Sequence, residues 1–312
     1  MQRTLSNRPL ITARPFLKWA GGKTQLLDEL VRRLPAEIIE SGTIENYVEP
    51  FVGGGAMFFY LKRRFDINKS YLFDINQELV IAYTIIKNDP DRLIKELSVI
   101  ECDYLQKSEA DRQSFYYNIR DLYNKQSHGF NYKKYNKKWV SRTAFLIFLN
   151  KTCYNGLFRQ NGSGAFNVPI GRYKNPKICD VKNLLESNAV LKDTEIIHGD
   201  FTLSSHFINM GSLVYLDPPY RPLNKTSHFK EYTRSGFSDN DQIRLSNYFK
   251  EMDKRGAFIL LSNSDPRNEN QDDDFFEQLY HGYNINKTLA NRMINSNVDR
   301  RGQIFELVIT NY

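Results

Sequence analysis

The residues best suited to chemistry are Asp217, Pro218, Pro219 and Tyr220, which directly follow the apolar run 212–216. That run predicts a buried strand, and open α/β sheets carry their reactive groups at the carboxyl ends of strands. The carboxylate of Asp217 only accepts hydrogen bonds, the prolines stiffen the turn, and Tyr220 offers a flat ring. Such a set suits a planar base with an exocyclic amine, whose N–H groups would bond to Asp217 and the Pro218 carbonyl while Tyr220 stacks on the ring. A rigid turn without chemistry is the alternative.

A second feature is the glycine turn 53–55, which lies between a predicted strand at 47–51 and a predicted helix. This arrangement is typical of nucleotide-binding sites. Asp74 ends the next predicted strand, at a spacing where an acid reaches ribose hydroxyls. Asp200 and Phe201, at a third strand end, add an acceptor for an adenine amine and an aromatic face. The three strand ends together predict an adenosine-shaped site.

Strands and helices alternate along the chain, which predicts an α/β fold with one mostly parallel sheet and helices on both faces. Two β-rich stretches near the end predict a closing hairpin, and the polar run 265–274 predicts a mobile loop. The expected elements are strands at 47–51, 70–73, 195–198, 213–216 and 257–261, helices at 56–64, 76–87 and 240–254, and hairpin strands at 283–289 and 303–310.

Positive charge is concentrated in the middle of the chain. The net charge is +7 with a pI near 9.1, and residues 103–182 hold 15 Lys and Arg against 5 Asp and Glu. Such a segment is typical of a polyanion-binding insertion in which lysines meet phosphates and aromatic rings meet bases. A helical cluster with a lysine-coated face is the alternative. The residues concerned are Phe130, Tyr132, Tyr135 and Trp139 among Lys133, Lys134, Lys137 and Lys138.

Several other protein classes are disfavoured by the sequence. The segment 21–24 ends like a phosphate-binding loop, but Leu17 stands where that loop requires a glycine. The three cysteines are too few for a disulfide framework, and none stands beside a proline as a cytosine-C5 nucleophile would. Histidine and cysteine spacing predicts no metal site. No apolar stretch is long enough to cross a membrane, so we expect a soluble, cytoplasmic protein without a membrane partner.

Four motifs, in order along nearly the whole chain, resemble those of the Dam-type DNA adenine methyltransferases, the D12 class with the α arrangement of segments. The motifs are 16–23, 49–55, 199–201 and 217–220. The resemblance implies a class I methyltransferase sheet, S-adenosylmethionine as cofactor, and a mainly helical DNA-recognition insertion with a β-hairpin. The implied divisions are residues 1–102 for the cofactor-binding half, 103–192 for the insertion and 193–312 for the catalytic half.

Residues 153–174 are similar to the recognition hairpin of GATC-modifying members of this family, with 162–164 as its turn. By this resemblance Arg159 would read a guanine, for which a bidentate guanidinium is suited. The resemblance implies Asp217, Pro218 and Tyr220 as catalytic residues; Trp19, Lys23, Phe51, Gly53, Gly55, Asp74, Asp200 and Phe201 as the cofactor site; and Lys18, Tyr154, Asn155, Leu157, Arg159 and Tyr173 as DNA contacts.

We therefore expect a site-specific methyltransferase that transfers a methyl group from S-adenosylmethionine to N6 of a flipped-out adenine in double-stranded DNA, within GATC. A cytosine-N4 methyltransferase is the nearest alternative, because that amine presents similar N–H groups. A catalytically silent DNA-binding module is the alternative from another class. The expected genetic partner is a cognate restriction endonuclease, in a prokaryotic or phage setting.

Overall fold

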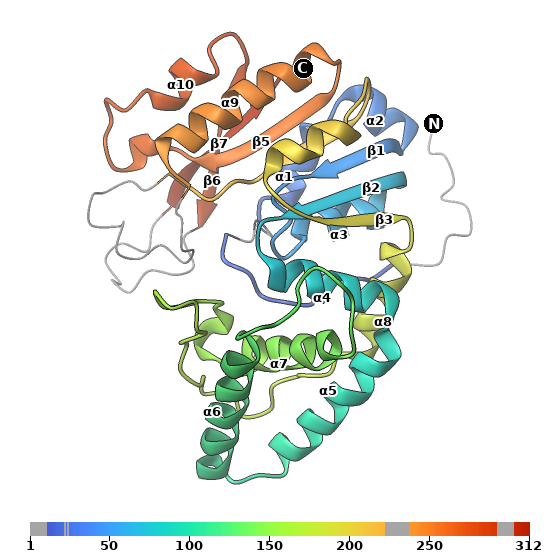
Figure 1. The fold of residues 1–312 in the computed structure, drawn as a ribbon. Coiled ribbons are helices and arrows are strands. Elements are labelled where there is room, and N and C mark those ends of the chain that lie inside the picture. Colours follow the sequence, from blue (N-terminus) through green and yellow to red (C-terminus); the bar gives the residue numbers. More distant parts are fainter. Residues whose placement is uncertain (1–10, 22, 24, 222–236, 292–302) are drawn as a thin grey trace.

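The computed structural model describes residues 11–21, 23, 25–221, 237–291 and 303–312, and its centre is a seven-stranded sheet (Figure 1). The strand order is β3-β2-β1-β4-β5-β7-β6. The first five strands in that order pair in parallel, whereas β7 is antiparallel to β5 and β6. The mostly parallel sheet and the closing hairpin are thus confirmed. The strands are β1 Thr43–Glu49, β2 Asp66–Asp74, β3 Thr194–His198, β4 Leu213–Leu216, β5 Phe258–Ser264, β6 Asn284–Asn291 and β7 Gln303–Thr310.

Helices cover both faces of the sheet because the central strands are apolar on both sides. Successive residues of a strand point to opposite faces. Tyr47 and Tyr215 pack with α1, α3 and α4, whereas Val48 and Val214 pack with α9 and α10. In the described part of the chain, no helix is long and apolar enough to cross a membrane. The helices around the sheet are α1 Leu27–Arg32, α2 Ala36–Ser41, α3 Ala56–Arg64, α4 Gln77–Asn88, α9 Asp239–Lys254 and α10 Phe275–Leu279.

A helical region between β2 and β3 extends away from the sheet, at the lower end of Figure 1. Its helices are α5 Pro90–Leu105, α6 Glu109–Gln126 and α7 Lys138–Thr152, and α8 Val181–Leu191 returns the chain to β3. Helix α7 packs on α4, α5 and α6. The division expected after residue 102 falls inside α5, so this helix continues without a break from one predicted region into the next.

The segment after α7 turns back on itself, but its described residues form no regular ladder. Two isolated antiparallel bridges, Cys153–Ile170 and Gln160–Phe166, replace the expected β-hairpin. Side chains take the place of ladder partners. Asn124 bonds to both the N–H and the carbonyl of Phe166, at 2.8 and 3.0 Å, and Tyr116 donates to the carbonyl of Val168 at 2.8 Å. Helix α6 therefore holds the segment in an irregular course.

A buried ion pair joins the helical region to the sheet half. Arg142 of α7 is 1% exposed, and its Nε and Nη2 donate to the Glu78 carboxylate of α4 at 2.8 and 2.5 Å. The Tyr132 hydroxyl also donates to Glu78, at 2.8 Å, while Phe130 lies 4.8 Å from the guanidinium. Trp139 is buried, and the four nearby lysines are exposed. This arrangement favours the lysine-coated helical cluster over a row of base-stacking rings.

The polar run 265–274 is anchored by contacts that its composition does not predict. Asp265 is 1% exposed and forms an ion pair with Lys287 of β6 at 2.6 Å. A short 3-10 turn, Pro266–Asn268, follows it, and Asp273 pairs with Arg221 at 2.7 Å. These contacts anchor both ends of the run, while residues 269–272 are exposed, so the mobility of this loop stays a prediction.

Candidate active site

Four acidic residues lie at one edge of the sheet. Glu49 and Asp74 end β1 and β2, Asp200 lies two residues after the end of β3, and Asp217 directly follows β4. The strands β2 and β4 lie on opposite sides of β1, so the strand order reverses here, and open α/β sheets bind their ligands at such a reversal. The fold therefore brings the predicted strand ends, far apart in sequence, to one edge.

Asp217 is partly exposed and has two hydrogen-bond donors in the described chain. Its Oδ1 accepts a hydrogen bond from the Lys23 ammonium and a longer one, 3.3 Å, from Ser262 Oγ of β5. The Tyr215 hydroxyl lies 3.1 Å from Ser262 Oγ. The hydrogen bonds from Lys23 and Ser262 both end on Oδ1 of Asp217, whose side chain is 20% exposed. The other carboxylate oxygen can therefore accept a bond from an arriving amine.

The turn that carries Tyr220 is fixed on both sides. Pro218 is buried, and the carbonyl of Pro219 accepts a hydrogen bond from Gln242 of α9 at 3.3 Å. Beyond Tyr220, the guanidinium of Arg221 bonds to Asp239 at 2.7 Å. The ring of Tyr220 is thus held by a stiff backbone at the end of β4.

Lys23 lies between Tyr220 and two carboxylates. Its Nζ is 4.5 Å from the centre of the Tyr220 ring and 3.7 Å from Oε2 of Glu306 on β7, and its side chain is only 4% exposed. Burial raises the pKa of Tyr220, and the carboxylates of Asp217 and Glu306 raise it further. The phenol therefore stays neutral near pH 7 and offers an uncharged ring face.

The glycine turn holds Asp74 in one orientation. Its two oxygens accept the backbone N–H groups of Gly53 and Asn76 at 2.9 and 2.8 Å. Burial raises the pKa of Asp74 to about 6, even though these hydrogen bonds act to lower it. Gly55 has φ 71, and a Cβ there would clash with the Tyr83 hydroxyl, so the position requires glycine. A fixed acid at a tight turn is suited to a sugar hydroxyl.

Trp19 connects the glycine turn with the helical region. A Cβ built on Gly53 would lie 3.0 Å from Cδ1 of the indole, so the turn and the ring are in close contact. On the other side the indole stacks on Phe158, with ring centres 5.0 Å apart. The predicted cofactor residue Trp19 therefore also packs against the predicted recognition segment.

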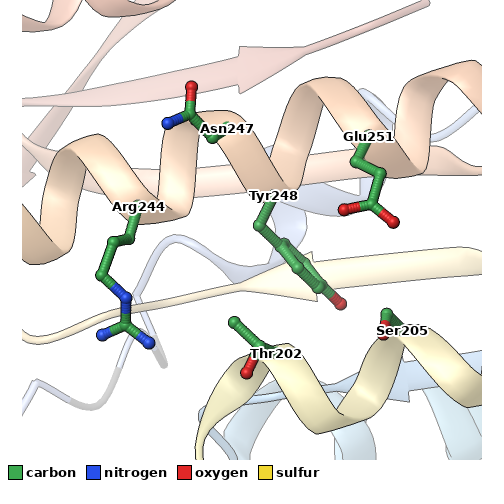
Figure 2. Close-up of a pocket in the computed structure, with 6 residues that line it drawn as sticks. All are labelled: Thr202, Ser205, Arg244, Asn247, Tyr248 and Glu251. Carbon is green, nitrogen blue, oxygen red and sulfur yellow. The ribbon is translucent and has the colours of Figure 1, made fainter.

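Phe51 and Phe201 form an aromatic pair with ring centres 5.5 Å apart. Beside it, Asp200 accepts a hydrogen bond from Arg244 of α9 at 3.0 Å. Figure 2 shows a hollow between α9 and the helical turn η2 Phe201–Phe207, toward which Arg244 and Tyr248 point. None of the predicted site residues lines it. Its lining is Thr202, Ser205, Arg244, Asn247, Tyr248 and Glu251.

Lys18 is exposed next to the recognition segment. The side chain of Asn150 bonds to the backbone N–H and carbonyl of Lys18 at 2.9 and 2.8 Å and to the carbonyl of Gly156 at 2.9 Å. The Lys18 ammonium lies 5.6 Å from the centre of the Tyr173 ring. Asn150 thus ties two of the predicted DNA-contacting segments together, and it was not predicted from the sequence.

Arg159 is oriented by its own segment. Its Nε donates to Oδ1 of Asn167 at 2.8 Å, and the side chain is part-buried. Tyr154 is 56% exposed, and Asn155 is exposed with φ 57, a left-handed backbone that few residues other than glycine adopt. Leu157 is half-buried. The structure thus presents Tyr154 and Asn155 to solvent beside a positioned guanidinium.

Besides Asn150, three residues around the Asp217 and Asp200 strand ends were missed by sequence reasoning: Ser262, Arg244 and Glu306. Each stands alone among residues typical of its strand or helix, without a motif around it. Only the strand register of β5 and β7 and the packing of α9 bring them to Asp217, Asp200 and Lys23.

A family model described as D12 class N6 adenine-specific DNA methyltransferase matches residues 19–294. The chain belongs to this family. It is 50% identical over 300 residues to type II methyltransferase M.MjaIII of Methanocaldococcus jannaschii. This match covers 96% of this chain and 99% of the relative. It is 37% identical over 310 residues to type II methyltransferase M1.LlaDCHI of Lactococcus lactis, with 97% and 96% covered. To the DNA adenine methylase of Escherichia coli it is 31% identical over 298 residues, with 95% and 94% covered.

The protein is therefore an adenine-specific DNA methyltransferase, as its motifs predict. The family description names adenine N6 as the methylated position, which leaves the cytosine-N4 alternative without support. The silent-module alternative is not supported either, because the matched family and its named relatives are methyltransferases. The methyltransferase needs a methyl donor and a DNA substrate.

Proposed function

We propose that this methyltransferase uses S-adenosylmethionine to methylate an adenine that is extruded from the duplex, within GATC. The observation that carries the proposal is Asp217 at the end of β4, a partly exposed acceptor beside the neutral ring of Tyr220. An amine inside a duplex cannot reach such a pocket, so the base must leave the stack at a cost of about a few kcal/mol.

Asp217 and the Pro218 carbonyl would accept the two N–H groups of the adenine amine. These bonds draw the nitrogen lone pair out of conjugation with the ring, so the amine becomes a better nucleophile. Positive charge develops on the nitrogen as the new carbon–nitrogen bond forms, and the Asp217 carboxylate stabilises that charge. The sulfur–methyl bond would break as the carbon–nitrogen bond forms, and the proton that the amine loses would pass along its hydrogen bond to the Asp217 carboxylate.

The residues around the glycine turn fit an adenosyl group. Asp74 offers fixed carboxylate oxygens for ribose hydroxyls, Asp200 would accept the adenine amine, and the Phe51–Phe201 pair offers ring faces. Trp19, Gly53 and Gly55 shape the turn, and Lys23, assigned to the same set, has its ammonium between Asp217 and Glu306. Bound there, S-adenosylmethionine would supply a methyl group on a positively charged sulfur.

The cofactor assignment predicts selective stabilisation. S-Adenosylmethionine at about 100 times its Kd should stabilise the folded protein by about 2.7 kcal/mol, whereas ATP with magnesium should not. Replacement of Asp74 by alanine should reduce this stabilisation because the ribose hydroxyls lose their acceptor. Thermal melts with each ligand check this, with Asp272→Ala, an exposed position, as the matched control. Equal stabilisation of Asp74→Ala and wild type would contradict the assignment.

We assign recognition of the DNA sequence to the segment that contains Arg159. The other residues of this set are Lys18, Tyr154, Asn155, Leu157 and Tyr173. Arg159 is already oriented by Asn167, and an arginine fork matches the O6 and N7 atoms of guanine. The exposed side chains of Tyr154 and Asn155 would enter the duplex at the place that the extruded base leaves, or support the duplex there. We assign this role to the region 103–192, between the cofactor-binding half 1–102 and the catalytic half 193–312, and propose a cognate restriction endonuclease as genetic partner.

The Arg159 assignment predicts relaxed specificity. Arg159→Ala should lose about 1–3 kcal/mol of discrimination at one position of the site, because two bonds to a base edge disappear. Lys133→Ala should instead weaken binding to all DNA and reduce the salt slope by about one unit, because a phosphate contact releases one counterion. Methylation-site sequencing and salt-titrated binding separate the two. An even loss of activity over all sequences in Arg159→Ala would show a backbone contact instead.

A further inference from the structure

Lys23 occupies the place where the proposed function requires the adenine amine. Its ammonium donates to Oδ1 of Asp217 and lies 4.5 Å from the Tyr220 ring centre. Although the other oxygen of Asp217 can still accept a hydrogen bond, a bound adenine must approach the same carboxylate and stack on the same ring. A cation held there would also repel the positive charge that develops on the amine nitrogen during transfer. The lysine ammonium must therefore shift when the base binds.

A second acceptor for the ammonium already stands within reach. Oε2 of Glu306 is 3.7 Å from Lys23 Nζ, an ion-pair distance that a small rotation of the lysine would shorten to a hydrogen bond. Apart from this ion pair, the atom is buried without a hydrogen-bond partner in the described part of the chain. A buried carboxylate oxygen in this position is costly unless it is paired.

Glu306 is also held rigidly. It lies in the middle of β7, opposite Ser264 of β5 and Thr288 of β6, and its side chain is 8% exposed. Burial raises the pKa of Glu306, and the Lys23 ammonium opposes that rise. Among the described residues, Lys23 is the cation that forms an ion pair with this carboxylate, so the two side chains are matched.

We propose that Glu306 is a positioning residue for methyl transfer: it takes the Lys23 ammonium when the target amine binds Asp217. The proposal rests on the proposed role of Asp217. Without Glu306, the lysine has only Asp217 as its carboxylate partner at this place. The ammonium then competes with adenine for the catalytic acceptor, so transfer slows although the fold and the cofactor site are retained.

The test is a double-mutant cycle measured as single-turnover rates on a duplex that the wild-type enzyme methylates, at saturating S-adenosylmethionine. Glu306→Gln should slow transfer about 10- to 100-fold, with the Kd for S-adenosylmethionine and the melting temperature nearly unchanged. In a Lys23→Met background, Glu306→Gln should have no further effect, because the competing ammonium is gone. Glu195→Gln, an exposed strand glutamate, is the control for lost charge and should match wild type.

Two results overturn the proposal: a wild-type rate in Glu306→Gln, or an equal loss in the presence and absence of the Lys23 side chain. The second result would assign Glu306 a role independent of the lysine. Where Glu306→Gln does not fold, the same cycle with Glu306→Met, which also lacks the carboxylate, decides by the same criterion. Asp217→Ala, measured alongside, tests the proposed function separately, because its rate depends on the acceptor itself and not on where the lysine rests.

Discussion

Asp217→Ala is expected to reduce methyl transfer by at least about 10²–10³-fold, because it removes the group that stabilises charge on the reacting nitrogen. The loss should fall on the rate of transfer more than on substrate binding, since the acceptor matters most as the amine changes geometry. Single-turnover transfer of a labelled methyl group to unmethylated DNA measures it directly.

Folding and cofactor binding serve as the controls for this variant. Asp217 directly follows β4, and its side chain is 20% exposed. We therefore expect a melting temperature close to that of wild type and a retained response to S-adenosylmethionine. Asp272→Ala should transfer methyl groups at the wild-type rate. Turnover of Asp217→Ala near the wild-type rate would remove the catalytic assignment.

Arg142→Met is expected to be the most destabilising single change, with a loss of about 3–5 kcal/mol in the free energy of unfolding. The variant leaves the buried Glu78 carboxylate without its arginine, and an unpaired buried charge has this cost. Urea unfolding followed by circular dichroism measures the loss. Lys138→Met, at an exposed position of the same helix, should stay within about 0.5 kcal/mol of wild type.

The double variant Glu78→Gln with Arg142→Met separates the ion pair from general packing. Because it removes both charges, it should be more stable than Arg142→Met alone. If the double variant is as unstable as the single one, then lost packing around the guanidinium and the rings of Phe130 and Tyr132 explains the effect, and the ion-pair argument fails.

The parallel part of the sheet could be predicted from the sequence because each of its strands contains a short apolar run that is followed by a polar or glycine-rich segment. Strands that end in Asp74 and Asp217 must place these side chains at the same edge once the strands are parallel. Local chemistry was therefore sufficient to place the turn 217–220 and the glycine turn at the same edge. It also predicted the hairpin β6–β7, whose two stretches are rich in β-branched and apolar residues.

Contacts between distant segments could not be predicted in this way. Arg142 counts as a surface charge in any local window, yet it pairs with Glu78, 64 residues earlier. Glu306 is one acidic residue in an apolar strand, and only the register of β7 turns it toward Lys23. The anchoring of the polar run 265–274 could not be predicted for the same reason, because the partner of Asp265 is Lys287 on another strand.

Nucleoside analysis of methylated DNA tests the central claim most directly. The protein is incubated with S-adenosylmethionine that carries a labelled methyl group and with unmethylated duplex DNA, and the DNA is then digested to nucleosides. The account predicts label in N6-methyladenine and none after Asp217→Ala. Label in N4-methylcytosine, or no transfer by the folded, cofactor-binding wild-type protein, would contradict it.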